Sequence, residues 1–160
     1  MKRNPGASVR TINGLMSLDS TVTQIIIDNG VGEPDFTVLD MTGFTKLKSL
    51  EIGDHCFSYV EEVRMIGMNE LESVAIGSKS FSKCKDQYIT TSDPNRHFYL
   101  KNCRKLKSLK IGCYSFSDYT LCEIENVLSV KVIEIGDLNE KSFCFRYGSL
   151  KLKSGIAESE

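Results

Sequence analysis

Cysteine and histidine are the residue types in this 160-residue chain that could build a metal site or a nucleophilic pair. The six cysteines are Cys56, Cys84, Cys103, Cys113, Cys122 and Cys144, and the two histidines are His55 and His97. No two cysteines have the C-x₂₋₄-C spacing that is typical of structural zinc sites. His97 and Cys103 are six residues apart, but this spacing does not by itself make a base face a nucleophile. The sequence therefore predicts no catalytic residue, no metal and no cofactor.

The cysteines are better explained as buried thiols, because the chain shows no export signal and several cysteines fall on core positions of a repeated pattern. Disulfides stay open as the alternative, since stacked repeats bring residues that are distant in sequence close together.

The elements that would position these residues follow from a phrase, L-x-x-L-x-I-G, that occurs four times. Its copies are LKSLEIG at 47–53, LESVAIG at 71–77, LKSLKIG at 106–112 and VKVIEIG at 130–136. The final glycines are 24, 35 and 24 residues apart, which indicates a 24-residue unit with one 11-residue insertion. Such a period predicts stacked units that bury their apolar faces against one another and present extended surfaces for binding.

Each unit also contains a second strand and a closing aromatic residue. The second strands are Leu39–Met41, Val63–Met65, Phe98–Leu100 and Cys122–Ile124, and the aromatics are Phe57, Phe81 and Phe116. The fourth unit has Glu140 at the closing position, with Phe143 three residues later. Stacking in register predicts three buried ladders, namely Leu47, Leu71, Leu106 and Val130; Leu50, Val74, Leu109 and Ile133; and Ile52, Ile76, Ile111 and Ile135.

Charged residues alternate in sign at equivalent outward positions of the units. One row is Lys46, Glu70 and Lys105, and the next is Lys48, Glu72 and Lys107. Neighbouring strands would place opposite charges about 4.8 Å apart, which favours the native order of the units. This row is interpreted as a solvated surface that sets the register, with a ligand-binding strip as the alternative.

The pattern divides the chain into a flexible N-terminal segment over 1–20, a repeat region over 21–152 and a frayed tail over 153–160. The insertion forms a loop at about 83–95, where Asp93-Pro94-Asn95 is a turn signal. TQIIIDNGVGEPDF is expected to be a degenerate or capping unit, and Leu150 and Leu152 resemble one more first strand. The last unit then leaves an unsealed apolar end, which predicts end-to-end self-association or a following domain.

The unit L-x-x-L-x-I-G-x-x-S-F, preceded by an alternating strand, resembles the leucine-rich repeats of the BspA-like type over about residues 36–152. The resemblance implies a leucine-rich-repeat solenoid that is mainly β, with short parallel strands on two faces and a right-handed coil of 24-residue repeats. It also implies a binding role, since the family is commonly found in surface proteins that take part in adhesion, and it supplies no catalytic residues.

Composition excludes several other classes of function. The net charge of −1 and the pI of about 6.2 provide no positive field to attract nucleic acid. No apolar run has the length of a membrane span, and the N-terminus lacks the apolar core of a signal peptide. A cytoplasmic location is therefore expected, unless the chain is a piece of a larger surface protein.

We accordingly expect a protein–protein interaction module that acts on a protein partner and is not an enzyme. The predicted partner-binding residues are Glu51, Ala75, Lys110 and Glu134 on the repeated strand, with Tyr88, Arg96 and His97 at the insertion. The alternative is a structural spacer of a larger repeat protein, with no ligand of its own. An enzyme is the third interpretation and would require a buried polar cluster beside a pocket.

Overall fold

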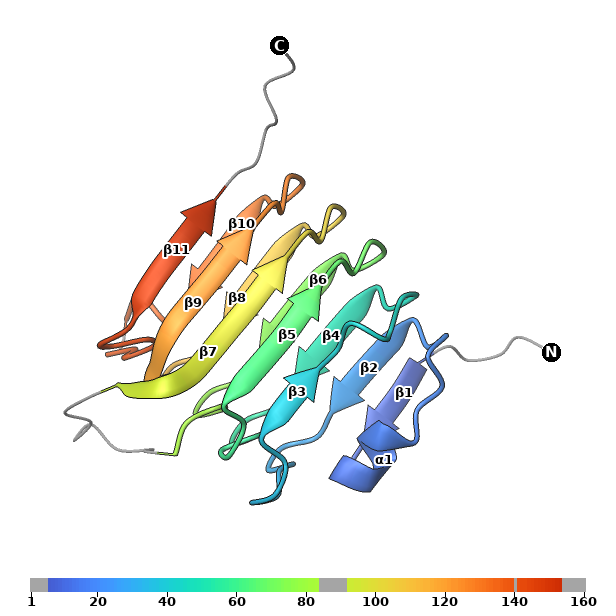
Figure 1. The fold of residues 1–160 in the computed structure, drawn as a ribbon, viewed down its shortest axis with the longest axis horizontal. Coiled ribbons are helices and arrows are strands. Elements are labelled where there is room, and N and C mark those ends of the chain that lie inside the picture. Colours follow the sequence, from blue (N-terminus) through green and yellow to red (C-terminus); the bar gives the residue numbers. More distant parts are fainter. Residues whose placement is uncertain (1–5, 84–91, 140, 154–160) are drawn as a thin grey trace, which may run out of the picture.

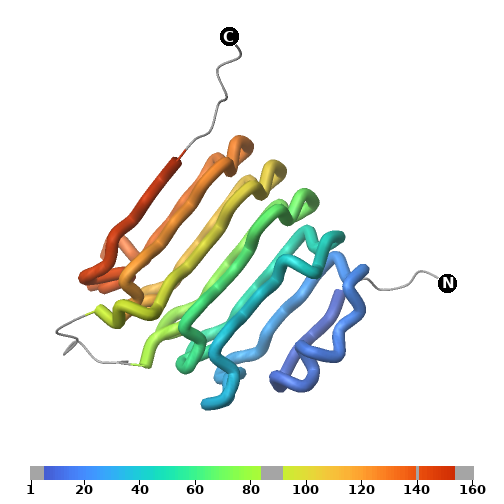
Figure 2. The backbone as a smooth tube through the Cα atoms, viewed as in Figure 1, coloured from blue at the N-terminus to red at the C-terminus, as the bar shows by residue number. Residues whose placement is uncertain are grey.

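The computed structural model describes residues 6–83, 92–139 and 141–153. The protein is mainly β, with two parallel sheets and almost no helix (Figure 1). From residue 24 onward, the backbone passes alternately from one sheet to the other as it advances along the molecule (Figure 2). This arrangement is compatible with the predicted class of β fold.

The first sheet has six strands and the second has five. In spatial order the six-stranded sheet contains β1 (Gly6–Val9), β2 (Gln24–Ile27), β4 (Ser49–Ile52), β6 (Ser73–Ile76), β8 (Ser108–Ile111) and β10 (Val132–Ile135). The five-stranded sheet contains β3 (Val38–Asp40), β5 (Glu62–Ile66), β7 (Asp93–Lys101), β9 (Tyr119–Glu125) and β11 (Ser149–Lys153). The single described helix is α1 (Ile12–Met16).

The strand register matches the predicted ladders, but the predicted burial fails in the fourth unit, where Ile133 is exposed and Val130 and Ile135 are half-buried. Leu50 pairs with Val74, Val74 with Leu109 and Leu109 with Ile133. The second strands agree as well, since Val63 is in register with Phe98. The inward side chains of the first three units are buried between the two sheets. The apolar alternation of each strand therefore fixes which face packs on the core.

The alternating charge rows are also confirmed. Lys105 Nζ lies 3.0 Å from Glu70 Oε2, and Lys107 Nζ lies 3.8 Å from Glu72 Oε1. These exposed pairs add little stability, but like charges at the same positions would disfavour this order of strands.

A stack of phenylalanines runs along the core where the units close. Phe57 and Phe81 have ring centroids 5.2 Å apart, Phe81 and Phe116 4.6 Å, and Phe116 and Phe145 5.1 Å. The sequence places Glu140, and not an aromatic residue, at the closing position of the fourth unit; in the structure Phe145 takes that place in the stack. Gly112 and Phe116 are four residues apart, whereas nine residues separate Gly136 from Phe145, so the fourth closure contains five additional residues.

The N-terminal segment is not flexible throughout, contrary to the expectation for residues 1–20. β1 pairs with β2 in parallel, and Val9, Ile12 and Leu15 are buried. Ile12 and Leu15 are three residues apart on α1, which places them on one face of the helix. The Thr11 side chain caps α1 by accepting a hydrogen bond from the Gly14 amide at 3.0 Å. This segment therefore covers the apolar end of the sheets.

The predicted insertion loop at about 83–95 is shorter in the structure than expected, because β7 already begins at Asp93. Thr120 Oγ1 donates to the Asp93 carbonyl at 2.6 Å, which fixes the start of this strand. Residues 84–91, and most of the predicted tail at 153–160, lie outside the described residues.

The strand-ending glycines allow neighbouring backbones to approach closely. A Cβ atom on Gly112 would lie 2.6 Å from the carbonyl carbon of Gly77, and one on Gly77 would lie 2.7 Å from that of Gly53. Gly112→Ala is therefore expected to lower the free energy of unfolding by about 1–3 kcal/mol, because the backbones must separate. The measurement is urea unfolding followed by circular dichroism.

Gly43→Ala is the matched control, because a Cβ atom at Gly43 meets no atom within 4 Å. Its unfolding midpoint should stay close to that of the native protein. Equal midpoints for the two variants would contradict the close approach.

Candidate functional site

Four of the predicted partner-binding residues form one row on the outer face of the six-stranded sheet. Glu51 pairs with Ala75, Ala75 with Lys110 and Lys110 with Glu134. The row continues through Ile26 of β2, which pairs with Glu51. Buried neighbours hold β4, β6 and β8 in place, so the row from Glu51 to Lys110 is a fixed surface of side chains from successive strands.

An open groove of about 680 Å³ crosses this row at the carboxyl ends of β2, β4 and β6. Ile26, Glu51 and Ala75 line it from the strands, and Asp28 and Asp54 line it from the turns that follow. Ala75 has a short side chain between Glu51 and Lys110, which leaves a depression in the row. The groove therefore combines an apolar wall at Ile26 with carboxylates around it.

The groove is negatively charged, since its lining residues include three carboxylates and no lysine or arginine. Asp28 pairs with Arg10 at 3.3 Å, and Asp54 Oδ1 accepts the Ser78 amide at 2.7 Å. The Glu51 carboxylate has no ion-pair or hydrogen-bond partner among residues 6–83, 92–139 and 141–153. Glu51 is thus available to receive a positive group.

The other end of the row is already paired. Lys110 Nζ lies 3.6 Å from Glu134 Oε2, and both side chains are more than half exposed. An exposed pair of this kind is weak, so these two predicted residues border the groove and add little to its charge.

Two of the three residues predicted at the insertion, Arg96 and His97, do not join the row. His97 lies on the outer face of the five-stranded sheet, on the opposite side of the core from Glu51. Its Nε2 lies 2.9 Å from the Pro94 carbonyl oxygen, and its Nδ1 lies 3.2 Å from the Tyr99 hydroxyl. Tyr88 lies outside the described residues.

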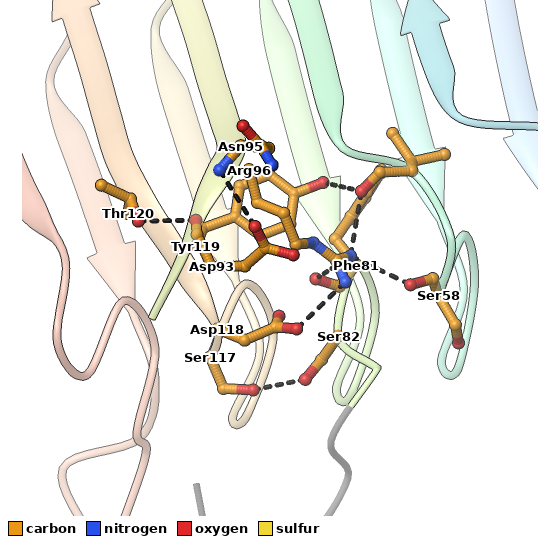
Figure 3. Close-up of polar contacts among 11 residues, drawn as sticks. Ser58, Phe81, Ser82, Asp93, Asn95, Arg96, Ser117, Asp118, Tyr119 and Thr120 are labelled. Carbon is orange, nitrogen blue, oxygen red and sulfur yellow. Dashed lines mark hydrogen bonds and ion pairs between the residues drawn. The ribbon is translucent and has the colours of Figure 1, made fainter. Parts of the chain in front are cut away.

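The prediction that Arg96 binds a partner is wrong, because its side chain is fully buried. Figure 3 shows its guanidinium directed toward Asp118, whose Oδ2 lies 3.0 Å from Nη1. Nη2 donates to the carbonyls of Ser58, Val60 and Phe81 at 2.9–3.2 Å. The group also packs 4.8 Å from the centre of the Tyr119 ring. Arg96 therefore joins three successive closing turns inside the protein.

Burial dominates the ionisation of the groups around Arg96. It raises the pKa of the Asp118 carboxyl, and the neighbouring guanidinium opposes that shift. It also raises the pKa of the Tyr119 phenol, whose hydroxyl donates to the Val60 carbonyl. Arg96 Nε and Asp118 Oδ1 have no hydrogen-bond partner among the described residues. This cluster lies in the core and not on an open surface.

The thiols are placed in the interior, as the sequence predicted. Cys56, Cys103 and Cys122 are buried, and the five described cysteines are free. Burial raises the pKa of the Cys103 thiol, that of Cys122 to about 12 and that of Cys144 to about 11. Because the thiolate is the reactive form, this environment disfavours nucleophilic chemistry.

His97 and Cys103 do not contact each other in these hydrogen bonds. The Cys103 Sγ donates to the carbonyls of Met65 and Lys101, whereas His97 contacts Pro94 and Tyr99. The described part of the chain contains no group of three or more His, Cys, Asp or Glu side chains arranged to hold a metal ion.

Ile26 is the groove residue that sequence reasoning missed. Its side chain is 37% exposed while Ile25 and Ile27 are buried. A signal was present, because three consecutive isoleucines in a strand with one buried face must expose the middle one.

Comparisons of this chain with protein-family models, with curated proteins and with solved structures give no match. No helix within the described ranges has the length and apolar character needed to cross a membrane. The functional conclusion therefore rests on the geometry of the outer row and its groove.

Proposed function

We propose that this chain is a BspA-like leucine-rich-repeat module that binds a partner protein through the outer face of its six-stranded sheet. The proposed fold is a right-handed solenoid of 24-residue repeats, and the proposed role is non-enzymatic. The observation that carries this function is the groove formed by Ile26, Glu51 and Ala75 across three adjacent strands.

The chemistry of the groove favours a polypeptide segment that carries a lysine or arginine beside an apolar side chain. The apolar side chain would cover Ile26 and the space above Ala75, and the cation would lie against Glu51. Asp28 and Asp54 add negative charge at the same place, so the groove would repel the phosphates of a nucleic acid.

The test uses a phage-displayed library of random short peptides, selected against the immobilised 160-residue protein. Peptides with a basic residue next to an aliphatic or aromatic residue are expected to be enriched. Glu51→Lys should weaken their binding by about tenfold or more, because like charges then meet in the interface. Ala75→Arg should have a similar effect by filling the depression.

Glu33→Lys is the control, since it makes the same change of charge at an exposed residue outside the groove. It should leave the affinity of the selected peptides unchanged. The proposal fails if no peptide is enriched, or if Glu51→Lys and Ala75→Arg bind the selected peptides as tightly as the native chain.

A structural spacer within a larger repeat protein is the second candidate. It is favoured by the apolar side chains that are open at β10 and β11, including Ile133 and Leu152. A spacer would bind no selected peptide in the groove, so the same selection separates the two functions.

A further inference from the structure

The two ends of the paired sheets are covered differently. At the N-terminal end, α1 packs Ile12 and Leu15 over the core. At the C-terminal end, the side chain of Ile133 is 37% exposed and that of Leu152 60%, although their neighbours Leu109 and Ile124 are buried. The inward faces of both β10 and β11 are therefore open.

An apolar opening of about 590 Å³ lies between these two edge strands. Its lining residues are Ile124, Val127, Leu128, Val130, Ile133, Leu152 and Lys153. Among the described residues, β10 and β11 are the last strands of their sheets, and each has one edge without a partner strand. A surface that could cover this opening would itself carry two edge strands with apolar residues between them. The same end of a second copy of the chain presents such a surface.

The outward charged side chains of the two edge strands differ in sign. On the six-stranded sheet the row ends in Glu134, after Lys110. On the five-stranded sheet Glu123 is followed by Lys151 and Glu125 by Lys153. Lys153 Nζ lies 3.9 Å from Glu123 Oε1, so this edge already alternates in sign. Within the strands, β10 thus presents one outward carboxylate and β11 two outward ammonium groups, while Lys131 lies just before β10 beside Lys107.

We propose that two copies of this chain dock through their C-terminal ends, with β10 of each copy beside β11 of the other. The strands of the two sheets run in opposite directions (Figure 1). A two-fold axis parallel to the strands then joins the six-stranded sheet of one copy to the five-stranded sheet of the other, with antiparallel edges. Glu134 meets Lys151 and Lys153 of the second copy, and Ile133 and Leu152 become covered.

The charges select this arrangement over the other two-fold pairing. An axis perpendicular to the sheets would place β10 beside β10 and β11 beside β11. Glu134 would then face Glu134, and Lys151 would face Lys151, so like charges would meet at both edges.

The experiment is sedimentation equilibrium of the full chain over a range of concentrations. The native chain should form a dimer, and Glu134→Lys should raise its dissociation constant by about tenfold or more. The combined variant Glu134→Lys, Lys151→Glu, Lys153→Glu should restore the native dissociation constant, because opposite charges meet again across the interface. Circular dichroism should show that each variant is folded.

The combined variant also separates contacts between copies from contacts within one copy. It still lacks the native pairs of residue 134 with Lys110 and of residue 153 with Glu123, so recovery must come from the other copy. Leu152→Glu should abolish the dimer independently, since it places a charge in the apolar opening.

A native chain that stays monomeric at all concentrations would overturn the proposal. A dimer that is unchanged by Glu134→Lys, or not restored in the combined variant, would overturn the arrangement with exchanged sheets. The groove at Glu51 lies on other residues, so failure here leaves the peptide selection unaffected.

Discussion

Phe116→Ala is expected to lower the free energy of unfolding by about 3–5 kcal/mol. Phe116 is fully buried and stacks between Phe81 and Phe145, with interplanar angles of 4° and 7°. It also meets the edge of the Tyr119 ring at 4.9 Å. Removing the ring leaves a cavity shared by three closing turns, and the aromatic contacts are lost together with the buried area.

The backbone at this position adds to the expected loss. Phe57, Phe81 and Phe116 have φ of 55°, and Phe145 has φ of 48°, which are unfavourable for residues with a Cβ atom. Packing of the rings compensates for that strain in the native protein. Alanine keeps the strain and loses the packing.

Tyr59→Ala is the control for Phe116→Ala, because Tyr59 is an aromatic residue with 43% of its side chain exposed. Its effect should be a small fraction of that of Phe116→Ala. Both are measured by urea unfolding at one protein concentration, since the proposed dimer would make stability depend on concentration. Similar losses for the two variants would show that the phenylalanine stack does not stabilise the fold.

Arg96→Met is expected to destabilise the protein by about 3–5 kcal/mol at neutral pH, because it leaves the buried Asp118 carboxylate without its cation. The carbonyls of Ser58, Val60 and Phe81 lose their shared donor at the same time. Arg64→Met serves as the control, since the ion pair of Arg64 with Glu62 lies at the surface. That variant should unfold at the native urea midpoint.

The cost of Arg96→Met should fall as the pH is lowered. Burial already raises the pKa of Asp118 above its usual value of 3.8, and the variant removes the guanidinium that opposes this shift. Between the unfolded and the folded pKa the native state binds more protons than the unfolded state. The stability of the variant must therefore fall as the pH rises through that window, and it is greatest on the acidic side.

Adding Asp118→Asn to Arg96→Met should remove most of this dependence on pH, because no buried carboxyl remains to titrate. Urea unfolding of the single and double variants across the acidic range measures the difference. A cost of Arg96→Met that is constant with pH would show that Asp118 is not held by the guanidinium.

The strands and their register could be predicted from the sequence because both follow from local alternation and a fixed spacing. Leu50, Val74 and Leu109 are equivalent in the pattern and adjacent in the sheet. The closing aromatic of the fourth unit could not be assigned from the sequence. Five additional residues shift the alignment there, and Phe143 and Phe145 are both aromatic. Packing against Phe116 decides between them, and that contact is not local.

The burial of Arg96 was not predicted for a related reason. Arg96, Phe98 and Leu100 alternate along β7, so a count of two residues already places Arg96 on the inward face. Residue type suggested a surface position instead, and the compensating Asp118 lies in the following closing turn. The helix α1 was not predicted either, because its five residues are too few to show a helical periodicity. Its stability depends on packing over the first unit.

Nuclear magnetic resonance mapping with a selected peptide tests the binding function most directly. The peptide is titrated into isotope-labelled protein, and the shifts of the backbone amides are followed. The proposed function predicts that the largest shifts cluster at Ile26, Glu51 and Ala75, and that Glu51→Lys abolishes them. Largest shifts at Tyr99 and Glu123, on the outer face of the five-stranded sheet, would contradict it.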